Sequence, residues 1–232
     1  MQREEFSYNA KLAEHSERYG DMIASMKSLI DEANGDINNE ERTLLSVAYK
    51  QAVGERRNAY RIISSYEQKQ KSRGQGNLEI TQEYKEKINK ELHALCSEII
   101  CLIDQKLLRD SDPDDIKLFY IKMKADYYRY MSESGDAAAV ESSNEAYQQA
   151  SDVAKNLPAN NPIRIGLALN YSVFKYEVLK ETAQAIELAK SAFDEALPQL
   201  DDLDERAYKE ATSILGLIKD NLALWTSEEE AD

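Results

Sequence analysis

Apolar residues recur along most of the chain at the three-to-four-residue spacing of amphipathic helices, interrupted by short polar or glycine-containing breaks. The breaks fall at residues 35–39, 73–77, 134–136 and 197–202. Strict apolar–polar alternation never persists long enough to predict a strand. The pattern predicts one very long helix over about 39–72, a second over about 78–109, and shorter helices beyond them. We therefore expect an all-α fold.

Local signals predict where several of these helices begin. Asn38 and Glu41 have the three-residue spacing of a capping box. The pairs Asp112–Pro113 and Asn161–Pro162 each place a capping residue before a proline suited to the first helical position. A helix of about 35 residues spans about 50 Å, which is too long for one small globule to cover. We expect a single domain over residues 1–227, built as one array of antiparallel helices, and a short acidic tail at 228–232.

The overall charge limits the classes of partner. The chain has 43 acidic and 29 basic residues, a formal net charge of −14. Such a charge argues against nonspecific binding to nucleic acid or to anionic membranes. No apolar run approaches the roughly 20 residues of a membrane span, and the first residues do not resemble a targeting peptide. Cys96 and Cys101 form no framework of pairs, so we expect a reduced, cytoplasmic compartment.

Catalytic and metal-binding patterns are missing from the sequence. His15 and His93 are far apart and lack the spacing of metal ligands. The glycines at 74 and 76 follow no strand and precede no Lys-Ser/Thr pair, so they do not form a nucleotide loop. No nucleophile and base occur at a recognisable spacing. We expect a protein without catalytic residues, cofactor or metal.

Basic residues gather on two predicted helices. Lys50, Arg57 and Arg61 share one helical face, because steps of seven and eleven residues return within about 20° of the starting direction, whereas Arg56 points elsewhere. On the later helix, Lys122 and Arg129 share a face with Asp126 between them and Tyr130 beside them. Such a pair of stripes suits an anionic group. Each stripe also fits an ordinary solvated face, and spacing does not show that the two helices meet.

Two further helices carry apolar stripes that each contain one asparagine. A stripe of this kind is either part of the core or the wall of a groove in which the amide bonds to a peptide backbone. The first stripe comprises Gly166, Leu169, Asn170, Val173 and Glu177, and the second comprises Ile214, Leu217, Asn221 and Trp225.

Four segments together resemble the 14-3-3 family. In chain order they read TLLSVAYKQAVGERRNAYRIISS, FYIKMKADYYRYM, NPIRIGLALNYSVFKYE and KDNLALW, and the resemblance runs from about residue 6 to residue 227. It implies about nine antiparallel helices that form a concave groove, in subunits that dimerise through their N-terminal helices. It also implies a non-catalytic adaptor that binds phosphoserine or phosphothreonine segments of client proteins, as a homodimer or a heterodimer with another family member.

The resemblance also implies roles for individual residues. The phosphate-binding residues are Lys50, Arg57, Arg129 and Tyr130, supported by Arg61 and Asp126. The peptide-binding residues are Lys122, Leu169, Asn170, Val173, Glu177, Ile214, Leu217, Asn221 and Trp225. The dimer interface comprises Leu12, Ser16, Arg18, Asp21, Tyr84, Lys87 and Glu91, with Arg18 and Asp21 placed to pair across it with Glu91 and Lys87.

An alternative reading is a scaffold similar to tetratricopeptide repeats that binds unphosphorylated tails. The spacing of Ala189 and Phe193 favours it, but no 34-residue period runs through the chain. Comparing one peptide with and without its phosphate separates the two readings.

Overall fold

The computed structural model describes the backbone of residues 2–74 and 76–229 and the side chains up to residue 227. The described residues form nine α-helices and no strand, which confirms the predicted all-α class. The chain divides into two compact units between Leu108 and Arg109. The helices of the first unit are α1 (Gln2–His15), α2 (Tyr19–Glu32), α3 (Asn39–Arg73) and α4 (Leu78–Leu102), followed by a π-helical turn, Ile103–Leu107.

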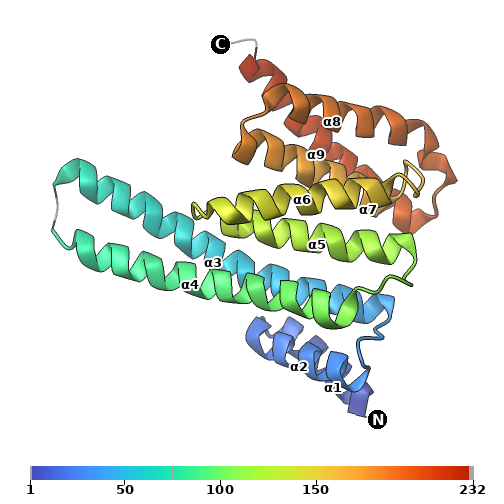
Figure 1. Ribbon diagram of the computed structural model, residues 1–232, viewed down its shortest axis with the longest axis horizontal. Coiled ribbons are helices and arrows are strands. Elements are labelled where there is room, and N and C mark those ends of the chain that lie inside the picture. Colours follow the sequence, from blue (N-terminus) through green and yellow to red (C-terminus); the bar gives the residue numbers. More distant parts are fainter. Residues whose placement is uncertain (1, 75, 230–232) are drawn as a thin grey trace. The chain divides into compact units, whose positions relative to one another are not determined.

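The first unit is built around the long antiparallel pair α3 and α4, against which α1 and α2 pack (Figure 1). Met22, Met26 and Leu29 of α2 and Leu45 and Tyr49 of α3 are fully buried in its core. Glu98 of α4 joins three helices, because it accepts hydrogen bonds from the Tyr49 hydroxyl (2.5 Å) and the Lys27 ammonium (2.9 Å).

Side chains at the helix starts agree with the sequence predictions at two of three places. Asn38 caps α3, and its capping box with Glu41 is complete. Asn161 caps α7 (Pro162–Phe174), where its side chain accepts from the amides of Ile163 and Arg164. The prediction for Asp112 was wrong: its carboxylate accepts from the Arg109 amide (2.9 Å) and closes the preceding turn, so the cap position of α5 (Asp114–Ser132) falls on Pro113. A local turn competes for the same carboxylate.

The described residues of the second unit form five α-helices, one π-helical turn and one 3₁₀-helix. Its α5 and α6 form an antiparallel pair, tied by the Ser143 hydroxyl, which donates to the Ala125 carbonyl (3.0 Å). The elements are α5 (Asp114–Ser132), α6 (Ala137–Ala154), α7 (Pro162–Phe174), a π-helical turn (Lys175–Leu179), α8 (Thr182–Ala196), a 3₁₀-helix (Leu197–Asp202) and α9 (Glu205–Glu229).

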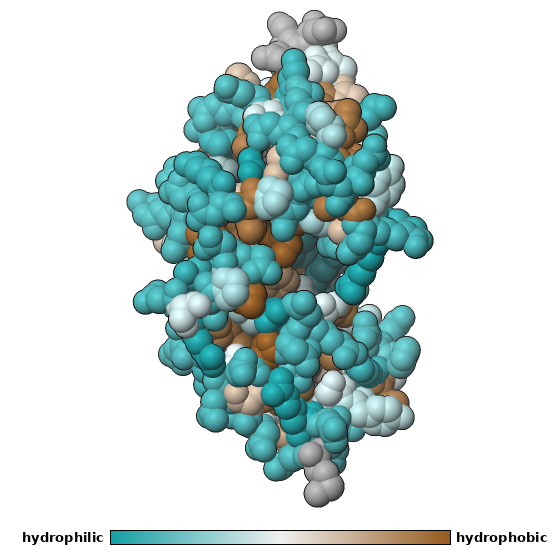
Figure 2. All heavy atoms as spheres, turned by 90° about the vertical axis from the view of Figure 1, so that its right-hand side faces the viewer, coloured by the Kyte–Doolittle hydropathy of each residue, from teal (hydrophilic) through white to brown (hydrophobic). Residues whose placement is uncertain are grey.

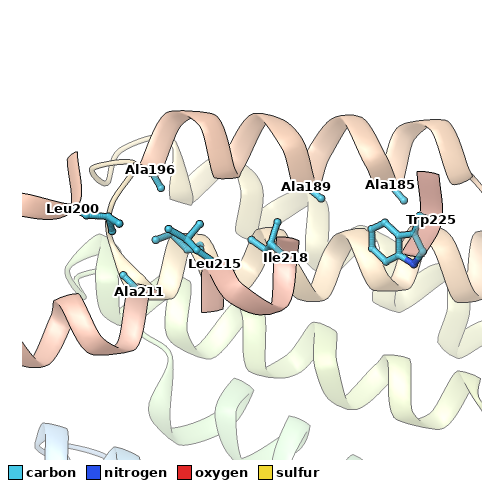
Figure 3. Packing of buried hydrophobic residues seen from close by; sticks show 9 residues of the cluster. Ala185, Ala189, Ala196, Leu200, Ala211, Leu215, Ile218 and Trp225 are labelled. Carbon is cyan, nitrogen blue, oxygen red and sulfur yellow. The ribbon is translucent and has the colours of Figure 1, made fainter. Parts of the chain in front are cut away.

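A core of small and large residues joins α8 to α9. Figure 3 shows Ala185 and Ala189 of α8 pointing towards the larger Ile218 and Trp225 of α9. Because alanine lets the two backbones approach closely, the larger partners fill the space between them. This packing fixes the position of α9 relative to α8. Helix α9 also contacts α7.

The first π-helical turn changes a helix end that apolar spacing had predicted. The second long helix was expected to reach about 109, but its α-helical part ends at Leu102, and Leu108 N–H bonds to Ile103 carbonyl (2.9 Å). Apolar spacing does not separate a widened turn from an α-turn. The predicted tail at 228–232 falls mostly outside the described residues, although α9 continues to Glu229.

Charged and polar side chains dominate the face shown in Figure 2, with hydrophobic side chains in small groups among them. Among the helices that the structure describes, none combines the length and the apolar character that a membrane crossing requires.

Candidate functional site

The candidate site of the second unit is organised around the carboxylate of Asp126 on α5. One of its oxygens, Oδ1, accepts from the Tyr147 hydroxyl of α6 (2.6 Å) and from the Asn170 amide of α7 (2.9 Å). The other, Oδ2, accepts from Lys122 (2.9 Å) and again from Asn170 (3.0 Å). Three helices therefore meet at one buried carboxylate.

Asp126 remains ionised despite its surroundings. Its exposed fraction is only 8%, and burial alone raises the pKa of a carboxyl group. The nearby charges of Lys122 and Arg129 and the hydrogen bond from Tyr147 outweigh burial, so the pKa of Asp126 lies below its usual value. A charged acceptor at this position orients the donors around it.

Arg129 is buried beside this carboxylate and is held on two sides. Its Nε donates to the Tyr147 hydroxyl (3.1 Å), and its guanidinium lies 4.8 Å from the centre of the Tyr130 ring. Its distances to carboxylate oxygens are longer, 3.9 Å to Asp126 and 3.8 Å to Glu133. The cation is thus fixed in direction while its close contacts are to neutral groups.

The amide of Asn170 has a defined orientation. Because a carboxylate only accepts, the NH₂ group must face Asp126, and the amide oxygen lies on the opposite branch. The sequence argument assigned this amide both a donor and an acceptor role towards a peptide. In the structure the Asn170 NH₂ group donates to Asp126, so the amide oxygen is the atom that can accept a hydrogen bond from a peptide.

The predicted groove wall lies partly on α7 and partly on α9. A Cβ atom added to Gly166 would lie 3.6 Å from Lys122 Cε and 3.8 Å from Ile214 Cδ1, so α5, α7 and α9 approach one another here. Leu169, Val173 and Ile214 are partly buried against the α8–α9 core. Leu217 is 52% exposed and Asn221 is partly exposed.

Two predicted peptide-binding residues, Trp225 and Glu177, do not have the positions that regular helical rotation gives to a groove wall. Trp225 is only 3% exposed and stacks on Tyr176, with ring centres 4.7 Å apart. Glu177 is exposed, but it lies in the π-helical turn after α7, where the 100° rotation per residue no longer holds. Helical rotation from Val173 therefore does not give its direction.

The α3 cations belong to the first unit. Lys50 and Arg61 are exposed, and Arg57 is partly buried. Arg56 turns towards α4: it pairs with Glu55 (2.7 Å) and lies 3.7 Å from Glu91. That Arg57 points in a different direction from Arg56 stays a prediction from helical rotation.

Comparison with known proteins decides the family. The family model described as 14-3-3 protein matches residues 9–226. The chain belongs to the 14-3-3 family. It is 49% identical to 14-3-3 protein beta/alpha-1 of Oncorhynchus mykiss over 237 residues, which cover all of this chain and 96% of the relative.

Other 14-3-3 relatives are similar to nearly the same degree. Identity is 49% to 14-3-3 protein beta/alpha-A of Xenopus laevis, covering this whole chain and 98% of the relative, and 48% to 14-3-3 protein beta/alpha of Rattus norvegicus, covering this whole chain and 96% of the relative. The 14-3-3 proteins are non-catalytic adaptors that bind phosphorylated client proteins and form homo- and heterodimers. The chain is accordingly a phosphopeptide-binding adaptor, and the tetratricopeptide reading is not favoured.

The residues predicted for the 14-3-3 dimer interface are exposed in the first unit. Leu12 on α1 is 49% exposed and Tyr84 on α4 is 55% exposed. Arg18 and Asp21, expected to pair across the interface, pair with each other within the chain. A hollow of about 390 Å³ on α3 and α4 is lined by Tyr84, Lys87 and Glu91 together with Arg56, Ala59 and Ile62.

Sequence reasoning missed two residues of this candidate site. Glu133 follows Arg129 by one helical turn, so the i, i+4 rule could have found it. Tyr147 lies 21 residues from Asp126 and 18 from Arg129, on a helix with no basic stripe. No local spacing indicates that contact.

Proposed function

We propose that Arg129 and Tyr130 of this 14-3-3 protein bind the phosphate group of a client segment. The observation that carries the proposal is a buried arginine whose direction is set by Tyr147 and Tyr130, while its carboxylate neighbours stay at 3.8–3.9 Å. A planar guanidinium so held suits bidentate binding of a phosphate. That Lys50 and Arg57, with Arg61 in support, bind the same phosphate remains a prediction from the family resemblance.

We also propose how the peptide backbone is recognised. The Asn170 oxygen, directed away from Asp126, accepts a hydrogen bond from a peptide N–H. Asn221 supplies a second amide on α9. Leu169, Val173, Ile214 and Leu217 form the apolar wall, Lys122 contributes a cation at its edge, and Trp225 supports the wall from the core rather than contacting the peptide.

Calorimetric titration of a serine peptide with a basic upstream flank tests this function. The phosphorylated peptide is expected to bind at least tenfold more tightly than its unphosphorylated twin, because one charge-assisted hydrogen bond alone contributes about 1.5–3 kcal/mol. Equal affinity for the two peptides would remove the proposed phosphate contact. Binding of only the unphosphorylated form would favour the scaffold alternative.

We also propose a cytoplasmic location, which is general for the family.

A further proposal concerns assembly. Exposed apolar side chains on α1, α3 and α4 support a dimer formed through the first unit. Tyr84, Ile62 and Ala59 line a hollow whose rim carries Lys87 and Glu91. An apolar centre with a charged rim is the usual composition of a protein interface. Two phosphate sites in one dimer would bind a doubly phosphorylated client more tightly than either alone.

Tyr84→Glu tests the dimer. The wild-type chain is expected to scatter light at micromolar concentration with twice its mass of 26.4 kDa, and Tyr84→Glu with the mass of a single chain. A carboxylate buried in an apolar interface without a partner is strongly unfavourable. Tyr208→Glu is the control, since Tyr208 is also an exposed tyrosine but lies on α9. If both variants keep the doubled mass, the interface lies elsewhere.

A further inference from the structure

The Tyr147 hydroxyl lies between the two charged groups of the α5 site. It accepts from Arg129 Nε (3.1 Å) and donates to Asp126 Oδ1 (2.6 Å). The direction of both bonds is fixed, because a guanidinium only donates and an ionised carboxylate only accepts. Among common side-chain groups a hydroxyl can do both at one atom, and a phenol carries it far enough to reach from α6.

The ring that carries this hydroxyl is enclosed by its neighbours. Tyr147 is fully buried. Its ring stacks on Tyr171 at 5.0 Å and lies 5.4 Å from Phe174, both on α7. One turn earlier on α6, Ser143 bonds to the α5 backbone. The hydroxyl is therefore placed by packing between two helices, and burial raises the pKa of Tyr147 so that it stays protonated.

This placement separates Arg129 from Asp126. Arg129 Nη2 lies 3.9 Å from Asp126 Oδ1, whereas a paired guanidinium and carboxylate normally approach to about 2.7–2.9 Å. Asp126 meanwhile bonds to Lys122 and Asn170. Without the hydroxyl, Arg129 and Asp126 could close into a direct bidentate pair, which would turn the guanidinium away and draw Asp126 from its other donors.

We propose that Tyr147 is a positioning residue for phosphopeptide binding: its hydroxyl holds Arg129 in direction and keeps it from pairing directly with Asp126, so that the guanidinium binds an external phosphate. The inference rests on the proposed phosphate contact of Arg129. It extends that proposal by assigning a role to a side chain that is too deeply buried to contact a peptide.

The test compares Tyr147→Phe with Tyr171→Phe. Each removes one hydroxyl from the same aromatic stack, but the Tyr171 hydroxyl bonds to Asn144, away from the charged groups. Affinity for one phosphoserine peptide is measured by calorimetry on protein shown to be folded by circular dichroism. Tyr147→Phe is expected to weaken binding at least tenfold, and Tyr171→Phe less than twofold.

A double-mutant cycle separates positioning from general packing. If Tyr147 acts through Arg129, Tyr147→Phe should have a much smaller effect in an Arg129→Ala background than in the wild type. Equal effects in the two backgrounds, or an equal loss from Tyr171→Phe, would overturn the inference.

Should Tyr147→Phe fail to fold, 3,5-difluorotyrosine at position 147 keeps the ring and hydroxyl but weakens the oxygen as an acceptor. It is expected to weaken binding in the same direction, and unchanged affinity would also overturn the inference.

The wild-type and Arg129→Ala arms keep the two proposals distinguishable. If the wild type does not discriminate phosphorylated from unphosphorylated peptide, or Arg129→Ala binds as the wild type does, the proposed phosphate contact fails. If both behave as expected and Tyr147→Phe binds like the wild type, only the role of Tyr147 fails.

Discussion

Replacing Asp126 by asparagine is expected to lower the free energy of unfolding by about 3 kcal/mol or more, the usual cost of removing one partner from a buried charged network. Asp126 accepts hydrogen bonds from Lys122, Tyr147 and Asn170 while 8% exposed. An asparagine side chain has only one acceptor oxygen, and its NH₂ group would face donors. It would also remove a negative charge that lies beside both Lys122 and Arg129.

Asp152→Asn is the matched control for this prediction. Asp152, on α6 in the same unit, pairs with Lys155 just after that helix, but both side chains are about three-quarters exposed. Its replacement should cost less than about 1 kcal/mol, as for other surface ion pairs. Urea unfolding can be followed by the fluorescence of Trp225, the single tryptophan of the chain, which is buried in the α8–α9 core. Similar losses for the two variants would contradict a special role for the Asp126 network.

Arg57→Ala is expected to weaken phosphopeptide binding by at least about 2 kcal/mol, because it removes a bidentate donor and leaves the phosphate under-satisfied. Arg56→Ala is expected to cost no more than about 1 kcal/mol. The two arginines are adjacent and chemically identical. The structure places Arg56 towards α4, with Glu55 and Glu91, so its charge is already partly compensated there.

Titration of these variants against one phosphopeptide at fixed salt measures the difference. Arg57→Lys is expected to recover only part of the loss, because an ammonium keeps the charge but not the planar pair of donors. Fixed salt matters, since exposed charges are screened over about 10 Å at ordinary ionic strength. If Arg56→Ala weakens binding as much as Arg57→Ala, the assignment of one α3 face to phosphate is wrong.

Much of the local structure could be predicted from the sequence. The capping box of Asn38 and Glu41 and the cap at Asn161 depend on groups two or three residues apart, so the same few residues that specify the helix start also form its bonds. The break at 73–77 and the long helix before it were likewise readable from glycine and from apolar spacing. The family itself was indicated by four segments and is confirmed by the match over residues 9–226.

The sequence also identified which α5 residues act together, because Asp126 lies one helical turn from Lys122 and one from Arg129. It did not indicate what completes their environment. Tyr147 and Asn170 reach Asp126 from 21 and 44 residues away on two other helices. Those two contacts depend on how α5, α6 and α7 pack, and no local spacing in the sequence indicates that packing.

The sequence by itself thus determined the all-α class, several helix ends, the family and the chemical types of the candidate site. Only the tertiary structure decided that Trp225 belongs to the core, that the Asn170 amide points its NH₂ at Asp126, and that a tyrosine hydroxyl separates Arg129 from that carboxylate. The physical reason is that a cap or an i, i+4 pair is fixed by the geometry of one helix. A buried hydrogen bond between helices exists only once burial and packing have brought its two ends together.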